Sequence, residues 1–262
     1  MSEYKTALIT GASGGIGAAF ARELARQGSD LVIVARSADK LNALATELRG
    51  AHRRRVEVIA DDLSQAGAGE RIKAKVDALG LPIDLLINNA GFGTMGPFIG
   101  IDPQREQEEI RLNVSALVDL THAFLPSMVS KGHGAVMNIA SAAAFQPLPY
   151  FATYAATKAF VVSFTEALWV ELRGSGVHAM SVCPGPVDTG FFEATGNDNA
   201  RKIVPKGTMV TAEVIVDASL RGLRSRSSLV TPGAVNSISS AVSRMLPGKW
   251  VALLVANATR SH

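Results

Sequence analysis

The chain has 262 residues, of which 47% are apolar and 19% charged, so it can bury the core of one large α/β domain. Its net charge of +3 and its one dense basic run, residues 52–55, do not make the continuous basic surface of a nucleic-acid-binding protein. The single cysteine, Cys183, excludes an internal disulfide bond and fits a reducing cytoplasm, where we expect the protein.

Short apolar runs alternate with helical segments along the first half of the chain. Runs rich in Val, Ile and Leu predict strands that are buried on both faces of a parallel sheet. These strands are residues 6–10, 31–35, 56–60 and 83–88. The intervening helices are residues 16–27, 38–48 and 68–79. We expect the first two helices to stop at Gly28 and Gly50, because glycine ends helices readily.

The same alternation continues in the second half. The expected strands are residues 135–140, 177–183 and 229–231, and the expected helices are residues 103–125, 151–173 and 210–223. We expect the first of these helices to stop near Pro126. The pattern predicts a single α/β domain, a doubly wound parallel sheet of about seven strands with helices on both faces. Its parts are a cofactor half at about 1–135, a catalytic and substrate half at about 136–235, and an apolar tail at about 236–262.

A glycine-rich turn joins the first strand to the first helix. Glycines here permit a tight turn and a close approach of the backbone to a pyrophosphate, while the helix start offers free N–H groups to phosphates. Glycine-rich loops are often only turns, but the place between a strand and a helix favours a dinucleotide. The residues expected to contact it are Gly11, Ser13, Gly14, Gly15, Ile16 and Gly17.

The end of the second strand indicates which dinucleotide binds. An NAD site usually has an acidic residue there, for the ribose 2′-hydroxyl. This chain has Ala35 followed by Arg36, whose guanidinium can pair with a 2′-phosphate. The alternative is an ordinary surface arginine. The sequence therefore favours NADP(H).

Three residues near the ends of later elements suggest proton transfer. Tyr154 and Lys158 are four residues apart in an expected helix, so they share one face. We expect the ammonium to lower the pKa of the Tyr154 phenol, which would then act as general acid or base. Ser141 follows the fifth strand, where its hydroxyl could polarise a substrate carbonyl. Taken singly, the Tyr–Lys pair is more often structural and the serine a turn former.

Together these motifs make the chain resemble the short-chain dehydrogenases/reductases with a Tyr-x-x-x-Lys centre, which have a Rossmann-like fold. The resemblance extends over about residues 5–189. It rests on the glycine-rich turn, on the Ser141, Tyr154 and Lys158 set, and on further short motifs. These are Asp62-Leu63, Asn88-Asn89-Ala90-Gly91, Asn113, and the stretch from Pro184-Gly185 through Val187 to Thr189.

The resemblance implies a role for each of these motifs. Asp62 and Leu63 would border the adenine, and Asn89, Ala90 and Gly91 would line the ribose. Asn113 would kink its helix and hold a water that links Lys158 to solvent, and Lys158 would also bind the nicotinamide ribose. Pro184 and Gly185 would lead to Val187 and Thr189, which would contact the carboxamide. A homodimer or homotetramer built on the two long helices is also implied.

We therefore expect an NADP(H)-dependent oxidoreductase that interconverts a carbonyl and an alcohol. A lid over residues 190–209 and nearby apolar side chains favour a lipophilic substrate; these side chains are Phe92, Met95, Phe145, Phe191 and Phe192. The alternatives are an NADPH-binding sensor without turnover, an isomerase or dehydratase on the same fold, and a peripheral membrane role for the tail. We expect no metal site, no signal peptide and no transmembrane helix.

Overall fold

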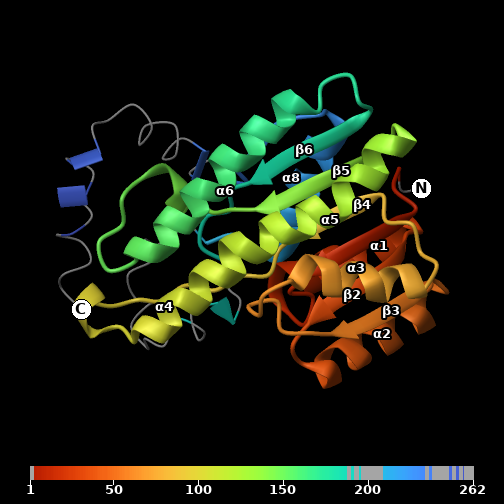
Figure 1. Cartoon of the computed structure of the whole chain (residues 1–262), viewed down its shortest axis with the longest axis horizontal. Helices are drawn as coiled ribbons and strands as arrows, with labels where there is room; N and C mark the ends of the chain where they lie inside the picture. Colours follow the sequence, from red (N-terminus) through yellow and green to blue (C-terminus); the bar gives the residue numbers. More distant parts are fainter. Residues whose placement is uncertain are drawn as a thin grey trace.

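The computed structural model describes residues 3–187, 190–191, 195, 209–233, 236–237, 248–249, 252–253 and 256. Its centre is one seven-stranded parallel sheet with the order β3-β2-β1-β4-β5-β6-β7 (Figure 1). The strands are β1 (Thr6–Thr10), β2 (Asp30–Ala35), β3 (Val56–Ala60), β4 (Leu85–Asn88), β5 (Gly134–Ile139), β6 (Val177–Val182) and β7 (Leu229–Val230). The predicted doubly wound α/β fold, with its seventh strand, is confirmed.

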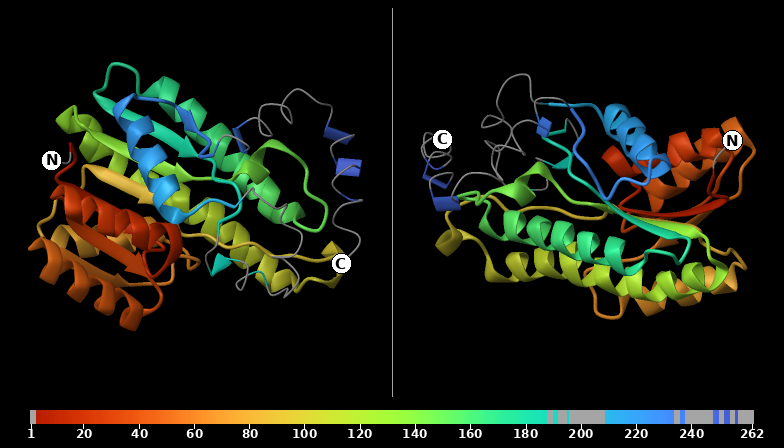
Figure 2. Two further views of the ribbon diagram at one scale, coloured as in Figure 1. Left: turned by 180° about the vertical axis from the view of Figure 1, so that it is seen from behind. Right: turned by 90° about the horizontal axis from the view of Figure 1, so that it is seen from above.

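Helices cover both faces of this sheet, and each face has its own apolar layer (Figure 2). The helices α1 (Gly15–Gln27), α2 (Ala38–His52) and α8 (Ala212–Arg224) lie on one face. The other face carries α3 (Ala68–Ala78), α5 (Ala116–Lys131) and α6 (Ala152–Glu171). Helix α4 (Pro103–Ile110) lies beyond the carboxyl ends of the strands, in line with α5 (Figure 1). Alternate residues of β1 supply the two layers: Ala7 and Ile9 pack with α1, and Leu8 packs with α3 and α5.

The strand order reverses beside β1. The chain runs outward from β1 to β2 and β3, and then returns so that β4 pairs with the free side of β1, with Ile9 opposite Ile87. In open parallel sheets a crevice forms at such a point, outside the carboxyl ends of the strands. The loops that follow β1 and β4 therefore lie next to each other.

Two predicted helix ends are wrong. Helix α2 passes through Gly50 and ends at Arg53, which has a left-handed φ of 52°. Helix α5 passes through Pro126 and ends at Gly132, with φ 65°. Buried side chains on both sides of Pro126, Phe124 and Met128, hold α5 against the core, and this packing outweighs the hydrogen bond that proline removes.

Two further boundaries follow from local hydrogen bonds. Helix α8 begins after Thr211, whose hydroxyl accepts from the N–H of Val214, so the predicted start at residue 210 is too early. Val210 instead pairs with Val187 in an isolated parallel bridge. The long predicted helix that begins at Pro103 is interrupted by a π-turn, η2 (Arg111–Ser115), which contains Asn113. The regular α-helical hydrogen-bond pattern is thus broken at the position where the kink at Asn113 is expected.

The stretch Pro103–Lys131 is, by length and composition, long and apolar enough to cross a membrane, and it is the one such helix in the described part of the chain. The core helices of folded domains pass the same test. Here Leu120, Phe124 and Met128 are buried in the layer that α5 shares with α3. This packing identifies the stretch as a core helix of the sheet domain.

Candidate active site

The glycine-rich turn after β1 leaves no room for side chains on its inner side. A Cβ on Gly17 would lie 2.4 Å from the Gly11 carbonyl oxygen, and a Cβ on Gly11, which has a φ of +66°, would lie 2.9 Å from the Ala90 Cα. Gly14 faces open space, and α1 starts after it without a side-chain cap. The first N–H groups of α1 are thus available to an anion, as the sequence predicts.

The loop after β4 holds this turn in place. The Asn89 side chain donates to the carbonyls of Thr10 at 2.9 Å and Gly11 at 3.3 Å. The Thr10 hydroxyl accepts from the N–H groups of Asn89 and Ala90, both at 2.9 Å. The Asn89 amide therefore braces the turn, a contact that the family motif alone did not reveal.

The end of β2 presents a cation beside the crevice. Arg36 is exposed, and within the described residues it makes no hydrogen bond or ion pair. Burial of the Asp62 carboxyl opposes its ionisation, but hydrogen bonds from Ser64 and Gln65 and the charge of Arg36 hold its pKa below the usual range. Arg36 is therefore available to an anionic group at this edge.

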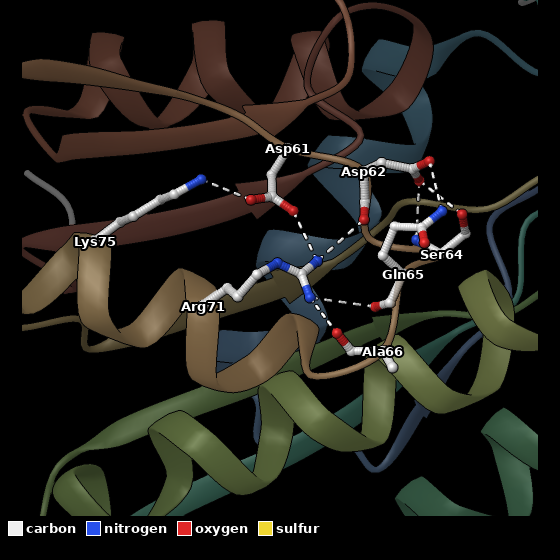
Figure 3. Close-up of polar contacts among 7 residues, drawn as sticks. All are labelled: Asp61, Asp62, Ser64, Gln65, Ala66, Arg71 and Lys75. Atoms are coloured by element: carbon white, nitrogen blue, oxygen red, sulfur yellow. Dashed lines mark hydrogen bonds and ion pairs between the residues drawn. The ribbon is translucent and has the colours of Figure 1, made fainter.

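The loop after β3 is held by one arginine that the sequence motifs did not include (Figure 3). Arg71 in α3 pairs with Asp61 at 2.9 Å and donates to the carbonyls of Asp62, Gln65 and Ala66. Lys75 pairs with the other Asp61 oxygen at 2.6 Å. Leu63 is buried within this loop. The network fixes the segment that carries Asp62 and Leu63.

Ser141, Tyr154 and Lys158 come together at the ends of β5 and α6. Ser141 caps the short turn η3 (Ala142–Phe145), where its hydroxyl accepts from the Ala143 N–H at 3.1 Å. The Lys158 ammonium lies 5.8 Å from the Tyr154 ring centroid. A Cβ on Gly93 would lie 2.8 Å from the Tyr154 ring, so this glycine lets the ring approach the chain. The structure thus assembles the three predicted residues.

Lys158 and Asn113 meet around the loop after β4. Lys158 is buried and donates to the Ile139 carbonyl at 2.9 Å. The Asn113 side chain donates to the Phe92 carbonyl at 2.8 Å and accepts from the Phe92 N–H at 3.2 Å. A Cβ on Gly91 would lie 2.9 Å from Asn113 Oδ1 and 3.4 Å from Lys158 Nζ. The absence of a side chain on Gly91 therefore leaves room for both Asn113 and Lys158.

The expected lowering of the Tyr154 pKa is wrong for this structure. Burial raises the pKa of Tyr154 to about 12, and the neighbouring Ser141 hydroxyl opposes this rise. Burial also lowers the pKa of Lys158 to about 8, against the opposing charge of Glu109. Both shifts have the same cause, since a low-dielectric surrounding penalises the charged form of each group.

The remaining predicted residues lie at the end of β6. Pro184 and Gly185 follow this strand, and Asn236 of the tail packs so closely on Gly185 that a Cβ there would lie 2.2 Å from its Nδ2. Val187 is buried. Thr189 and Phe192 lie outside the described residues.

The predicted apolar pocket is only partly assembled. The Phe191 ring lies 5.2 Å from that of Tyr154, centroid to centroid. Phe92 is buried with the Arg105 guanidinium 4.0 Å above its ring, and Phe145 packs against the core beside α6. Met95 is half-buried. Phe191 is thus the aromatic side chain that lies directly against the predicted catalytic tyrosine.

A buried acidic cluster next to this site was not predicted. Thr94, Glu106 and Glu109 are all buried, and the Thr94 hydroxyl contacts both carboxylates. The only sequence signal was the pair of glutamates three residues apart, on one face of the helix that leads to Asn113. No group of metal-binding side chains is present among the described residues.

The residues present fit a dinucleotide. The glycine turn forms a cradle that any Cβ on Gly11 or Gly17 would fill, and the uncapped start of α1 and the exposed Arg36 face the same end of the sheet. The free N–H groups at the start of α1 suit the pyrophosphate of a dinucleotide. The guanidinium of Arg36 suits a further phosphate such as the 2′-phosphate of NADP(H).

Comparisons with known proteins agree with this geometry. The family model described as short chain dehydrogenase matches residues 5–200. The human very-long-chain 3-oxoacyl-CoA reductase is 31% identical over 98% of this chain and 81% of that protein. A short-chain dehydrogenase from Sphingobium yanoikuyae in complex with NADPH is 34% identical, with a TM-score of 0.81, over 96% of this chain and 93% of that chain.

A second solved structure has a similar extent of agreement. The bulky-bulky ketone specific alcohol dehydrogenase from Comamonas testosteroni is 31% identical, with a TM-score of 0.78, over 93% of each chain. The family match and these similarities extend across the sheet and the assembled Ser141, Tyr154 and Lys158. The chain belongs to the short-chain dehydrogenase family of oxidoreductases.

Proposed function

We propose that the protein is an NADP(H)-dependent reductase or dehydrogenase that interconverts a lipophilic ketone or aldehyde and its alcohol. The observation that carries this proposal is the convergence of Ser141, Tyr154 and Lys158 at the carboxyl ends of the central strands, with the Lys158 ammonium 5.8 Å from the centroid of the Tyr154 ring. A cofactor sensor would need the glycine turn but not this second group of residues, so the sensor alternative is not favoured.

Tyr154, Ser141 and Lys158 have different roles in proton transfer. NADP(H), when bound, supplies or accepts the hydride. Tyr154 donates its phenolic proton to the carbonyl oxygen in reduction and takes it back in oxidation. Ser141 donates a hydrogen bond to the same oxygen, which stabilises the charge that develops there. The Lys158 ammonium stabilises the phenolate of Tyr154 after the proton has left.

The preference for NADP(H) rests on Arg36. Its guanidinium is exposed and unpaired within the described residues, beside the end of β2 where a 2′-phosphate would lie. The Sphingobium relative was solved in complex with NADPH, as was the L-sorbose reductase from Gluconobacter frateurii, which is 27% identical. Both observations support the phosphorylated cofactor.

The proposal of a lipophilic substrate is based on the apolar side chains that surround Tyr154. The rings of Phe151 and Phe191 lie 6.1 Å and 5.2 Å from the Tyr154 ring. Relatives that carry this fold are named for a very-long-chain 3-oxoacyl-CoA and for bulky-bulky ketones. We therefore favour a carbonyl with a sizeable apolar substituent on at least one side.

Cofactor oxidation with a panel of aliphatic, aromatic and 3-oxoacyl carbonyls tests the proposal. We expect turnover with NADPH to exceed turnover with NADH, and Tyr154→Phe to lower kcat by about 10² or more while NADPH binding persists. Tyr150→Phe, in the same segment, is the matched control and should keep its activity. Wild-type turnover by Tyr154→Phe would contradict the assignment of the general acid.

We also propose a homo-oligomer in a reducing cytoplasm. The α5 and α6 helices expose apolar side chains, namely Val129, Phe160 and Val170. The sole thiol, Cys183, is buried, where it packs as an apolar group. These features support an interface on the two long helices and a protein that needs no disulfide bond.

A further inference from the structure

The loop after β4 joins the catalytic centre to a buried acidic cluster, residue by residue. The side chains of Lys158 and Asn113 both reach the space beside Gly91, where a Cβ would lie 3.4 Å and 2.9 Å from them, and Phe92 exchanges two hydrogen bonds with Asn113. Two residues later, the Thr94 N–H donates to Glu109 Oε2 at 2.8 Å. Glu109 precedes Asn113 by four residues, so both project from the same side of the helical stretch across the π-turn.

The contacts of Thr94 require a proton on the cluster. Its single hydroxyl lies 2.6 Å from Glu106 Oε1 and 2.7 Å from Glu109 Oε2. A hydroxyl has one hydrogen to donate, so only one of these short contacts can come from Thr94. The other needs a hydrogen on a carboxyl group. Each carboxyl group accepts one further hydrogen bond, Glu106 from the Thr153 hydroxyl and Glu109 from the Thr94 N–H. Glu109 Oε1 has no hydrogen-bond partner among the described residues, which makes Glu109 the better holder of that proton.

Glu109 has one oxygen with no partner. Its side chain is fully buried, and its Oε1 has no hydrogen-bond partner within the described part of the chain. Lys158, which is also buried, has the Ile139 carbonyl as its one hydrogen-bond acceptor and forms no ion pair among the described residues. Each of these groups, when charged, lacks a direct counter-ion in a low-dielectric surrounding, and the charge of each favours the charged form of the other.

We propose that Glu109 is a positioning residue that acts through Lys158: its carboxylate is the counter-charge that keeps the Lys158 ammonium protonated, while Glu106 and Thr94 determine how much of that charge is present. This inference rests on the proposed function, in which Lys158 supports Tyr154. The proposal adds to Ser141, Tyr154 and Lys158 a carboxylate on α4 that acts through Lys158 and not by contact with substrate or cofactor.

The charged groups around the pair agree with this assignment. Burial raises the pKa of Glu109 to about 7; the hydrogen bonds of Thr94 and the charge of Lys158 oppose this rise, and the charge of Glu106 adds to it. Burial lowers the pKa of Lys158 to about 8, while the charge of Glu109 acts in the opposite direction. As the pH rises past neutrality, Glu109 loses its proton to solvent and gains the charge that holds Lys158 in its ammonium form.

A titration of Lys158 by NMR, in the protein without cofactor, tests the proposal directly. Protein carrying lysine labelled with ¹³C at Cε is compared for wild type, Glu109→Gln and Glu108→Gln, and Lys158→Met identifies the resonance. Glu108 is the matched control, because it lies on the same helix, is only half-buried, and pairs with Arg105. We expect the midpoint of Lys158 to fall by about one pH unit in Glu109→Gln and to stay in place in Glu108→Gln. An unchanged midpoint in Glu109→Gln would overturn the proposal.

Kinetics then separate this proposal from the proposed function. The rate of carbonyl reduction should decline at lower pH in Glu109→Gln than in wild type, because Lys158 loses its proton earlier. Absence of turnover in wild type would contradict the proposed function, yet the NMR midpoints would still decide the role of Glu109. A shifted midpoint combined with an unshifted rate profile would contradict the link from Glu109 to catalysis.

A second variant covers the case in which Glu109→Gln does not fold. Glu106→Gln removes the like charge that favours the protonated form of Glu109. We expect Glu109 to ionise at lower pH in this variant, so that the Lys158 midpoint stays at or above its wild-type position. A midpoint that falls in Glu106→Gln, as if a counter-charge had been lost, would overturn the assignment to Glu109.

Discussion

At the scale of single residues, Gly17 and Gly14 belong to one motif but differ in the structural reason for a glycine. Gly17 packs against the chain, where a Cβ would lie 2.4 Å from the Gly11 carbonyl oxygen, whereas Gly14 faces open space. The sequence pattern names both residues without telling them apart. The difference comes from the approach of α1 to the turn after β1, which only the tertiary structure supplies.

Gly17→Ala should therefore destabilise the protein where Gly14→Ala does not. The new methyl group has to displace backbone, for which we expect a cost of about 1–3 kcal/mol in the free energy of unfolding, with weaker NADPH binding as a consequence. Gly14 has extended backbone, with φ 179°, so alanine fits there without strain. Thermal unfolding of both variants without cofactor provides the measurement. Equal melting temperatures would show that the turn relaxes around the methyl group.

At the scale of elements, the loop after β3 depends on one side chain of α3. Arg71 joins the Asp61 carboxylate to three carbonyls of the loop, and Lys75 touches only Asp61 (Figure 3). We expect Arg71→Ala to weaken NADPH binding about tenfold, because a loosened loop must be ordered when the adenine binds. Lys75→Ala, the matched control, should bind NADPH like wild type. Fluorescence titration with NADPH measures both, and equal affinities would contradict the role of Arg71.

Gly50, at which the sequence predicts the end of a helix, belongs to the interior of α2, and this place determines the effect of a substitution there. Gly50 lies inside α2 and is exposed, and a Cβ added to it would have no heavy atom within 4 Å. Gly50→Ala should raise the free energy of unfolding by roughly 0.5–1 kcal/mol, because alanine loses less backbone entropy in a helix. Gly28→Ala should lower it, since Gly28 ends α1 with φ 99°. Urea unfolding distinguishes the two signs, and a loss of stability in Gly50→Ala would contradict the interior position.

The same elements show what the sequence can predict. The alternation of strands and helices predicts the doubly wound sheet, because periodicity and order are local properties of the chain. The helix end at Pro126 was wrong because packing of α5 on the core outweighs the local preference of a single residue. The helix end at Gly50 was wrong by two residues, since α2 continues to His52 and the left-handed residue is Arg53. The Thr94, Glu106 and Glu109 cluster depends on a loop that meets α4 in space. Without that contact, the glutamates resemble any polar face of a helix.

At the scale of the whole molecule, the site lies where the two halves of the sheet meet. The cofactor half contributes the turn after β1 and Arg36, and the catalytic half contributes Ser141, Tyr154 and Lys158. The loop after β4, at the reversal of strand order, contacts both groups through Asn89 and Gly91. A change in this loop therefore acts on cofactor binding and on proton transfer together.

The outer surfaces of α5 and α6 carry the last prediction, which concerns assembly. Phe160 is 41% exposed and stacks on Phe164, and Val170 is 54% exposed, so apolar area lies on the solvent side of α6. Apolar side chains gathered on a helix surface are typical of a subunit interface. If copies of the chain associate there, Phe160→Asp should place a charge in a buried interface and shift the protein to a smaller species in size-exclusion chromatography with light scattering. Ile99→Asp is the control, because Ile99 is 98% exposed on η1 (Phe98–Gly100), away from α6. A Phe160→Asp variant of unchanged size would place any interface elsewhere, whereas dissociation would show that the helix carrying Tyr154 and Lys158 is also the helix on which the copies meet.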